Sequence, residues 1–276
     1  MPGKPAPAEP PFPWRSDMLE GKYAIVTGGS AGIGASITEC LLKAGAKVAV
    51  LARSKAKYDK LLEEKGWDGS TTTFIPIDLA STDAIHSACV EANEWAGGCA
   101  DILINNAGVA MIAPILETSV EDWDWTMNVN VRAPFIMAKE CARRMIARGK
   151  GGKIVSTAST ASIFALHDHA PYCTSKAAIN GLTKQVMAAE WSKYDIQCNT
   201  IGPTIVLTDM GAKAWGKPEK GDPMLDRTPL GRFAEPWEMA HGVIFLVSPS
   251  SSQMCGQMLL LDGGITTTGT PCGIQG

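Results

Sequence analysis

From Lys22 onward, short apolar segments alternate with longer stretches in which apolar residues recur at helical spacing. Short apolar runs bounded by turn residues predict strands, and the longer amphipathic stretches predict helices. The predicted strands cover residues 23–27, 47–52, 71–77, 101–105, 153–157, 196–201 and 257–261. The predicted helices cover residues 32–44, 55–65, 82–95, 120–148, 171–194 and 235–246.

This order of elements indicates the fold class. Strands that are apolar throughout and separated by helices are typical of a parallel sheet covered on both faces. Seven such strands joined by right-handed crossovers predict a doubly wound Rossmann fold of the α/β class. No linker or repeat divides the chain, so we expect one domain over residues 18–276, preceded by an arm at residues 1–17.

Residues 202–234 break the alternation. They are rich in Pro, Gly and Asp, with short helical pieces at 210–215 and 224–227. Long irregular insertions are uncommon unless they form lids or binding loops. This one follows the carboxyl end of the sixth strand, where ligands bind in open α/β sheets, so it is predicted to be a substrate lid.

Composition narrows the range of partners. The 276 residues are 45% hydrophobic and 19% charged, with a net charge of −3. No basic stripe favours nucleic acid or a membrane surface, and no apolar run approaches the ~20 residues that span a bilayer. Eight widely spaced cysteines without a Cys-x2-Cys pair predict free thiols in a reducing cytoplasm.

The first seventeen residues contain six prolines and no apolar core like that of a signal peptide. This composition predicts an extended or disordered arm. An alternative remains open, in which Phe12 and Trp14 dock the arm on a neighbouring subunit.

Tyr172 and Lys176 carry the most informative pattern, because residues four apart share one face of a helix. A tyrosine hydroxyl titrates near pH ~10 in water, and a neighbouring cation is expected to lower its pKa. A phenol tuned in this way can give a proton to a ketone as a hydride arrives. Ser159 lies thirteen residues upstream, directly behind the predicted strand 153–157. This combination predicts a nicotinamide-dependent oxidoreductase.

Gly28, Gly32 and Gly34 lie in the turn between the first strand and the first helix. Glycines allow the backbone to approach a pyrophosphate, and the helix start supplies free N–H groups. Because the turn directly follows a strand near the amino terminus, a cofactor site is favoured over a simple tight turn.

The end of the second strand bears on the choice of cofactor. NAD-specific proteins usually place a carboxylate there, whereas this strand is followed by Arg53. An arginine can bind a 2′-phosphate in bidentate fashion, which favours NADP(H) over NAD(H); a solvated surface arginine is the alternative. Asp78 could accept a bond from the adenine amino group or cap the next helix, a role for which Ser81 and Thr82 compete.

The sequence leaves the roles of two further sets of residues undecided. Asn106, Ala107 and Gly108 follow the fourth strand and could hold the backbone on the nicotinamide side or be purely structural. His167 and His169 lack a third ligand at suitable spacing, so no metal site is predicted. His169, just before Tyr172, could line the substrate pocket or be a simple exposed histidine.

Taken together, these motifs resemble the short-chain dehydrogenase/reductase family over about residues 19–264. The resemblance implies that Ser159 binds the substrate carbonyl oxygen and that Tyr172 is the general acid in reduction. It also implies that Lys176 holds the nicotinamide ribose and lowers the tyrosine pKa, and that Asn130 anchors a water in a proton relay. The implied cofactor contacts are Tyr172, Lys176, Gly28, Ser30, Ala31, Gly32, Ile33, Gly34, Arg53, Asp78, Leu79, Asn106, Ala107, Gly108, Pro203, Val206, Thr208 and Met210.

Two departures from the family pattern bear on these expectations. The usual Pro-Gly after the sixth strand is Pro203-Thr204 here. The glycine-rich turn has Ala31 where NADP-dependent members often have a basic residue, which weakens the prediction of NADP(H).

Within the family, the lid sequence and Tyr172-Cys173 resemble the L-xylulose/dicarbonyl reductase and sugar-alcohol dehydrogenase branch. This implies NADPH-dependent reduction of a small ketose or α-dicarbonyl, or alternatively NAD-dependent oxidation of a polyol such as arabitol, xylitol or threitol. His169 and Trp215 would line the pocket, although Trp215 could instead pack the lid or contact another subunit. The family also implies a homotetramer, and the sequence alone leaves a dimer as the alternative. A nucleotide-binding regulatory protein without catalysis is disfavoured, because the four catalytic positions are intact.

Overall fold

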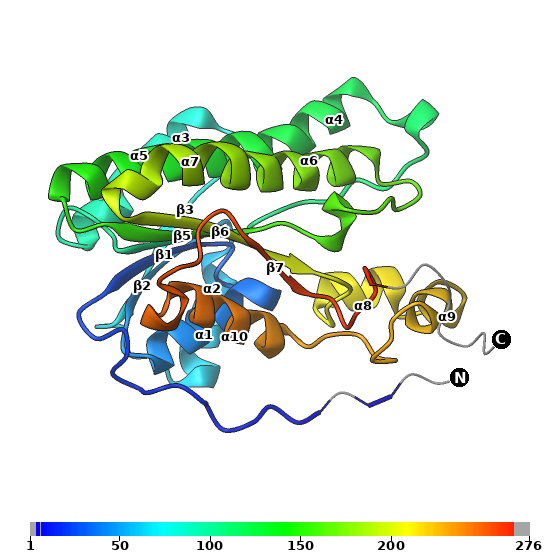
Figure 1. The fold of residues 1–276 in the computed structure, drawn as a ribbon, viewed down its shortest axis with the longest axis horizontal. Helices are drawn as coiled ribbons and strands as arrows, with labels where there is room; N and C mark the ends of the chain where they lie inside the picture. The colour runs from blue at the N-terminus through cyan, green and yellow to red at the C-terminus, as the bar shows by residue number, and fades with distance from the viewer. Residues whose placement is uncertain (1–3, 6, 268–276) are drawn as a thin grey trace.

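Seven parallel strands form one sheet in the order β3-β2-β1-β4-β5-β6-β7 (Figure 1). The computed structural model describes residues 4–5 and 7–267. The predicted Rossmann α/β fold is confirmed, with each strand within a few residues of its expected place. The strands are Tyr23–Thr27 (β1), Lys47–Ala52 (β2), Thr72–Pro76 (β3), Ile102–Asn105 (β4), Gly152–Thr157 (β5), Ile196–Pro203 (β6) and Met258–Leu261 (β7).

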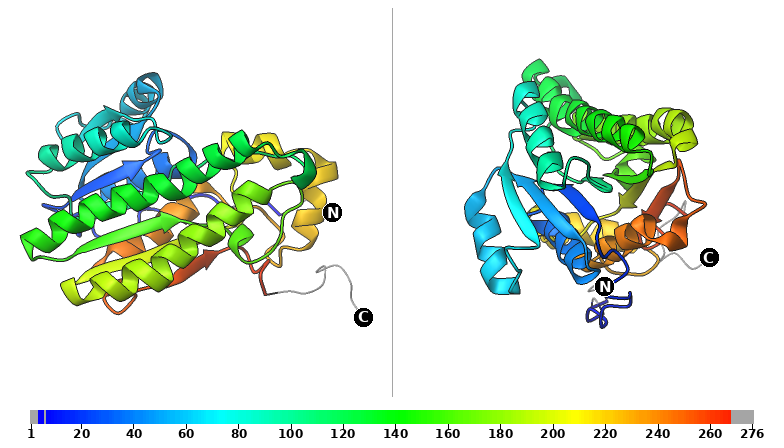
Figure 2. Two further views of the ribbon diagram at one scale, coloured as in Figure 1. Left: turned by 90° about the horizontal axis from the view of Figure 1, so that it is seen from above. Right: turned by 90° about the vertical axis from the view of Figure 1, so that its left-hand side faces the viewer.

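Helices cover both faces of the sheet (Figures 1 and 2). One core lies between the sheet and α1, α2 and α10, and the other lies between the sheet and α3 to α7. The helices are Gly32–Lys43 (α1), Lys55–Lys65 (α2), Thr82–Trp95 (α3), Val120–Met127 (α4), Ala133–Arg148 (α5), Ala170–Gly181 (α6), Ala188–Trp191 (α7), Asp209–Trp215 (α8), Pro218–Asp226 (α9) and Pro236–Val247 (α10). No helix in the described part of the chain is both long and apolar enough to cross a membrane.

The direction of strand addition reverses next to β1. Strands β2 and β3 extend the sheet to one side of β1, and β4 then pairs with the other side. The sheet therefore has its topological switch point between β1 and β4. Such a switch point is where ligands bind in open α/β sheets.

Two of the long predicted helices contain a π-helical turn. Asn128–Arg132 joins α4 to α5, and Leu182–Met187 joins α6 to α7. A π-helical turn inserts one extra residue into the helical ladder and changes which side chains face inward; such turns are frequent at functional sites. The first of them contains Asn130.

The predicted lid is folded into two short helices, α8 and α9. Its second helical piece begins at Pro218, six residues before the expected start, and proline is well suited to a first helical turn. Val206 and Ala234 pair in a parallel bridge that joins the two ends of the lid.

Residues 4–5 and 7–15 of the arm form no helix or strand, and a turn begins at Ser16. Phe12 and Trp14 pack, partly buried, against the core on the α1 and α10 side of their own chain. In Figure 1 this dark blue segment runs along the side of the molecule that carries α1 and α10. The seven cysteines in the described part of the chain are free thiols, and Cys272 lies outside it.

Candidate active site

The turn after β1 is built so that only glycine fits at two positions. Gly28 has a φ of +69°, which favours glycine, and a Cβ on Gly34 would lie 2.2 Å from the Gly28 carbonyl oxygen. Helix α1 then begins at Gly32 behind Ala31, which offers no side-chain cap. The backbone N–H groups of the first helical turn are therefore left for a ligand, and the turn fits the pyrophosphate of a dinucleotide.

The segment after β4 holds this turn in place. The backbone N–H groups of Asn106 and Ala107 donate to the Thr27 hydroxyl, at 3.0 and 3.2 Å, and Asn106 Nδ2 donates to the Thr27 carbonyl at 3.2 Å. A Cβ on Gly108 would lie 3.3 Å from both Asn130 Oδ1 and Lys176 Nζ. The backbone after β4 thus bridges the glycine-rich turn and the predicted catalytic side chains.

Ser159, Tyr172 and Lys176 come together from two elements. Ser159 follows β5, is buried, and accepts a hydrogen bond from the Ala161 N–H at 3.1 Å. Tyr172 lies in the first turn of α6 and Lys176 lies one turn later, with Nζ 5.6 Å from the centre of the phenol ring. Lys176 Nζ also donates to the Thr157 carbonyl at 2.8 Å. The pattern Tyr-x3-Lys therefore does place both side chains on one helix face.

Burial has the largest influence on the pKa values of Tyr172 and Lys176. It raises the pKa of Tyr172, and a hydrogen bond with Ser159 acts in the opposite direction. Burial also lowers the pKa of Lys176 to about 8. The expected lowering of the tyrosine pKa by Lys176 is therefore wrong for this structure, because desolvation of the phenolate outweighs the stabilising contacts.

Asn130 lies in the π-helical turn and ties three segments together. Its Nδ2 donates to the Val109 carbonyl at 2.8 Å and to the Ser175 hydroxyl at 2.9 Å, while its Oδ1 accepts from the Val109 N–H at 2.9 Å. Ser175 in turn donates to the carbonyl of Tyr172 at 2.7 Å. Asn130 thus fixes the loop after β4 against the helix that carries the phenol. Its role in anchoring a water stays a prediction.

The predicted adenosine contacts lie along the same edge. Arg53 is exposed just after β2, whose Leu51 carbonyl accepts from Gly28 N at 2.7 Å. Asp78 Oδ1 accepts from the Ala80 N–H at 2.9 Å, and Ser81 caps α3. The helix-capping alternative for Asp78 is therefore wrong, because Ser81 occupies that position.

The first turn of the lid reaches the glycine-rich turn. Thr208 caps α8 through its hydroxyl and lies so close to Gly32 that a Cβ there would be 3.0 Å from Thr208 Cγ2. Val206 is buried beside it. Met210, in contrast, has 63% of its surface exposed, so it does not close the site in this structure.

The lid and the segment between Ser159 and Tyr172 meet through ring contacts. His169 stacks on Trp215 with ring centres 6.4 Å apart and an interplanar angle of 18°, and its other neighbour is Tyr172 at 6.2 Å. Arg227, after α9, lies 5.9 Å from the ring centre of Phe164. This second contact was not predicted from the sequence, because neither residue belongs to a motif.

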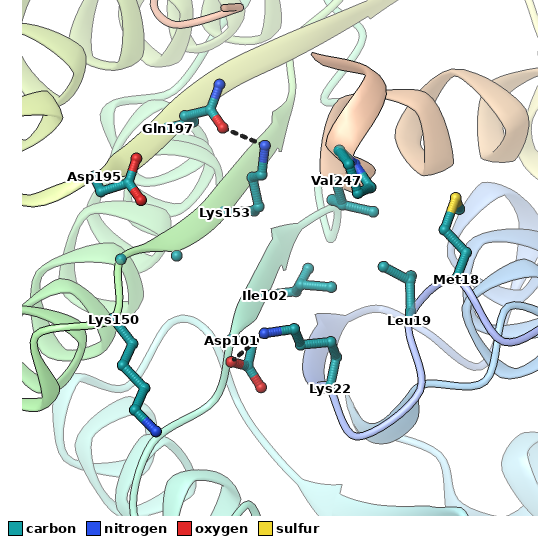
Figure 3. Close-up of a pocket in the computed structure, with 13 residues that line it drawn as sticks. Met18, Leu19, Lys22, Asp101, Ile102, Lys150, Lys153, Asp195, Gln197 and Val247 are labelled. Atoms are coloured by element: carbon teal, nitrogen blue, oxygen red, sulfur yellow. Dashed lines mark hydrogen bonds and ion pairs between the residues drawn. The ribbon is translucent and has the colours of Figure 1, made fainter. Parts of the chain in front are cut away.

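A cavity of about 210 Å³ lies at the opposite, amino-terminal edge of the sheet (Figure 3). Lys22 there pairs with Asp101 at 3.5 Å, and Lys153 donates to Gln197 Oε1. These strand starts are a full strand length from the carboxyl edge, so the cavity is separate from the catalytic group.

Comparison with known proteins agrees with this geometry. A family model described as enoyl-(acyl carrier protein) reductase matches residues 28–266. The chain is 40% identical to D-threitol dehydrogenase of Mycolicibacterium smegmatis, over 90% of this chain and 94% of that protein. It is 41% identical to L-xylulose reductase of Bos taurus, over 91% of this chain and 98% of that protein.

Solved structures show the same fold. The gluconate 5-dehydrogenase from Burkholderia cenocepacia J2315, in complex with NADP and tartrate, superposes with a TM-score of 0.84 at 33% identity, over 92% of this chain and 98% of that one. The chain therefore belongs to the short-chain dehydrogenase/reductase family and is an NAD(P)-dependent oxidoreductase that interconverts CH–OH and C=O groups.

Proposed function

We propose that the protein is an NADP(H)-dependent reductase of a small ketose or α-dicarbonyl. The observation that carries this proposal is the convergence of the Ser159 and Tyr172 hydroxyls near a glycine-rich dinucleotide turn. His169 contacts the Tyr172 ring and stacks on Trp215 of the lid. Relatives that bear the names D-threitol dehydrogenase and L-xylulose reductase support a short polyhydroxy substrate.

In the proposed reaction the carbonyl oxygen of the substrate accepts hydrogen bonds from Ser159 and Tyr172. The nicotinamide supplies the hydride when the cofactor is bound. Tyr172 then gives its proton to the developing alkoxide, and its raised pKa keeps it protonated at neutral pH. Lys176, while charged, stabilises the phenolate that remains. The residues run the reverse reaction, oxidation of an alcohol, with Tyr172 as base.

The side chains that we assign to substrate binding are of mixed polarity. His169 and Trp215 offer flat ring faces with N–H groups at their edges, which suit the C–H faces and hydroxyl groups of a short sugar chain. A small polyhydroxy carbonyl compound is the substrate class that we infer.

The proposal is tested by initial rates of NADPH and NADH oxidation with xylulose, ribulose, erythrulose and diacetyl, each measured with purified protein. We expect turnover with one of these carbonyl compounds and a preference for NADPH. A preference for NADH together with oxidation of threitol, xylitol or arabitol would instead establish the polyol dehydrogenase that is the alternative. Inactivity towards all of these compounds would contradict the proposed substrate class.

Arg53 is expected to decide the cofactor preference. Arg53→Ala removes a bidentate donor to the 2′-phosphate, and one hydrogen-bonded charge contributes about 1.5–3 kcal/mol, so Kd for NADPH should rise roughly tenfold to a hundredfold. Kd for NADH should stay within about twofold, because that cofactor has no phosphate there. Fluorescence titration measures both constants.

A matched control for this variant is Lys55→Ala, which also removes an exposed cation near the same strand end. Lys55 is paired with Asp59 at 2.6 Å, so its loss should change neither constant much. An equal response of NADPH and NADH to Arg53→Ala would refute the assignment of the 2′-phosphate site.

We also infer a homotetramer. The outer helical layer leaves large apolar side chains exposed, among them Trp125, Phe135 and Val186. In Figure 2 the two long helical runs that carry these residues lie side by side on one face. Packing of this face on its copy would remove it from water. Light scattering should give a mass of about four times 29.2 kDa, and a mass of 29.2 kDa would contradict the assembly.

A further inference from the structure

The amino-terminal arm is anchored on its own domain by aromatic side chains. The Phe12 ring lies 6.3 Å from the ring of His241 on α10, which in turn contacts Trp237 at 5.3 Å. Trp14 packs on the same core as α1 and α10, and its indole nitrogen is buried. Apolar burial of two large rings stabilises this placement of the arm.

Both ends of the arm are also fixed by backbone contacts. At its carboxyl end the Leu19 N–H donates to the Ala44 carbonyl at 2.8 Å, just after α1. At its amino end the Lys4 N–H donates to the Gly231 carbonyl at 2.7 Å, in the loop between α9 and α10. The Lys4 side chain also lies over the open side of Gly231, with Cδ 3.7 Å from where a Cβ would stand.

The loop that the arm contacts is the base of the lid. Three residues after Gly231, the Ala234 N–H donates to the Ile205 carbonyl at 3.0 Å, and the Leu207 N–H donates to the Ala234 carbonyl at 2.8 Å. Thr208 follows directly and lies against Gly32 of the glycine-rich turn. Backbone hydrogen bonds, the chain between Gly231 and Ala234, and the Thr208 side chain therefore connect Lys4 to the cofactor-binding turn.

We propose that the arm is a strap that holds the base of the lid and thereby positions residues 206–208 for the cofactor. The arm lies outside residues 28–266, which the family model matches. The proposal rests on the proposed function only through the location of the cofactor site. The proposed roles of Ser159, Tyr172 and Lys176 in the reaction do not depend on the arm.

The sharpest test compares two substitutions at one position. Lys4→Pro removes the N–H group that donates to Gly231, whereas Lys4→Ala keeps it and removes only the side chain. Kd for the preferred reduced cofactor, from fluorescence titration, should rise about fivefold in Lys4→Pro, which is the effect of one hydrogen bond, and stay within about twofold in Lys4→Ala. At saturating cofactor kcat should be unchanged in both variants.

Hydrogen exchange gives a readout that needs neither substrate nor cofactor. In Lys4→Pro the amides of residues 205–208 and 228–235 should exchange faster than in Lys4→Ala, while those of β1 and β4 should not change. The double variant Phe12→Ala and Trp14→Ala should reproduce this pattern. If exchange and Kd are the same in Lys4→Pro and Lys4→Ala, the strap is refuted. If wild type binds neither cofactor but exchange changes as expected, the strap stands and the proposed function fails.

Discussion

Replacing Tyr172 with phenylalanine is expected to lower kcat for carbonyl reduction by about a thousandfold, the middle of the range that one general acid contributes. The substitution removes only the hydroxyl. The ring keeps its contacts with His169 at 6.2 Å and with Lys176 at 5.6 Å, so the pocket and the cofactor site should keep their shape. Fluorescence titration should accordingly give an unchanged Kd for the reduced cofactor.

Tyr194→Phe is the matched control, since this tyrosine is exposed and lies at the far end of the same helical run. It should retain the wild-type rate. Substantial turnover by Tyr172→Phe would overturn the proposed mechanism, whereas a loss of both turnover and cofactor binding would show that the phenol is structural.

The sheet could be predicted from the sequence because its strands are buried on both faces. Val26, Val50 and Ile104, for example, are fully buried, and their segments are apolar throughout. Burial on both faces gives an unbroken apolar run, and the intervening helices leave only a parallel sheet with crossovers. The π-helical turns were missed because they shift the helical phase by one residue without any change in polar and apolar composition.

The catalytic group was predictable because its residues are close in sequence or follow strand ends, which a parallel sheet brings to one edge. The contacts of the lid could not be predicted. His169 and Trp215 are 46 residues apart, and nothing in the sequence of either segment indicates that it contacts the other. The pKa of Tyr172 was predicted in the wrong direction for a similar reason. The spacing Tyr-x3-Lys indicates that a cation lies near the phenol. The burial that raises the pKa of Tyr172 depends on the whole fold.

The position of the arm illustrates the same limit. Its prolines indicate an extended chain, and Phe12 and Trp14 indicate a docking surface, but neither specifies which surface. The receiving surface is formed by α10, more than 200 residues later in the chain. Composition therefore gives the conformation of such a segment, whereas its location requires the folded structure.

The charge on Lys176 should determine how kcat/KM falls at alkaline pH. Burial lowers its pKa to about 8, so its charge is present below that pH and is lost as the pH rises through it. A neutral lysine no longer stabilises the phenolate left on Tyr172, so kcat/KM for the cofactor in the reduction direction should fall above about pH 8. Lys176→Met should lower this quantity by about a hundredfold at pH 7, the usual effect of one preorganised electrostatic group, and should abolish the alkaline fall.

Lys184→Met, which removes an exposed lysine from the same helical run, should leave both the rate and the pH profile unchanged. The two variants separate a local charge effect from a general loss of positive charge. Persistence of the alkaline fall in Lys176→Met would assign the titration to another group. An unchanged rate at pH 7 would show that the ammonium does not act on Tyr172, and that its hydrogen bond to the Thr157 carbonyl serves only to hold β5 against α6.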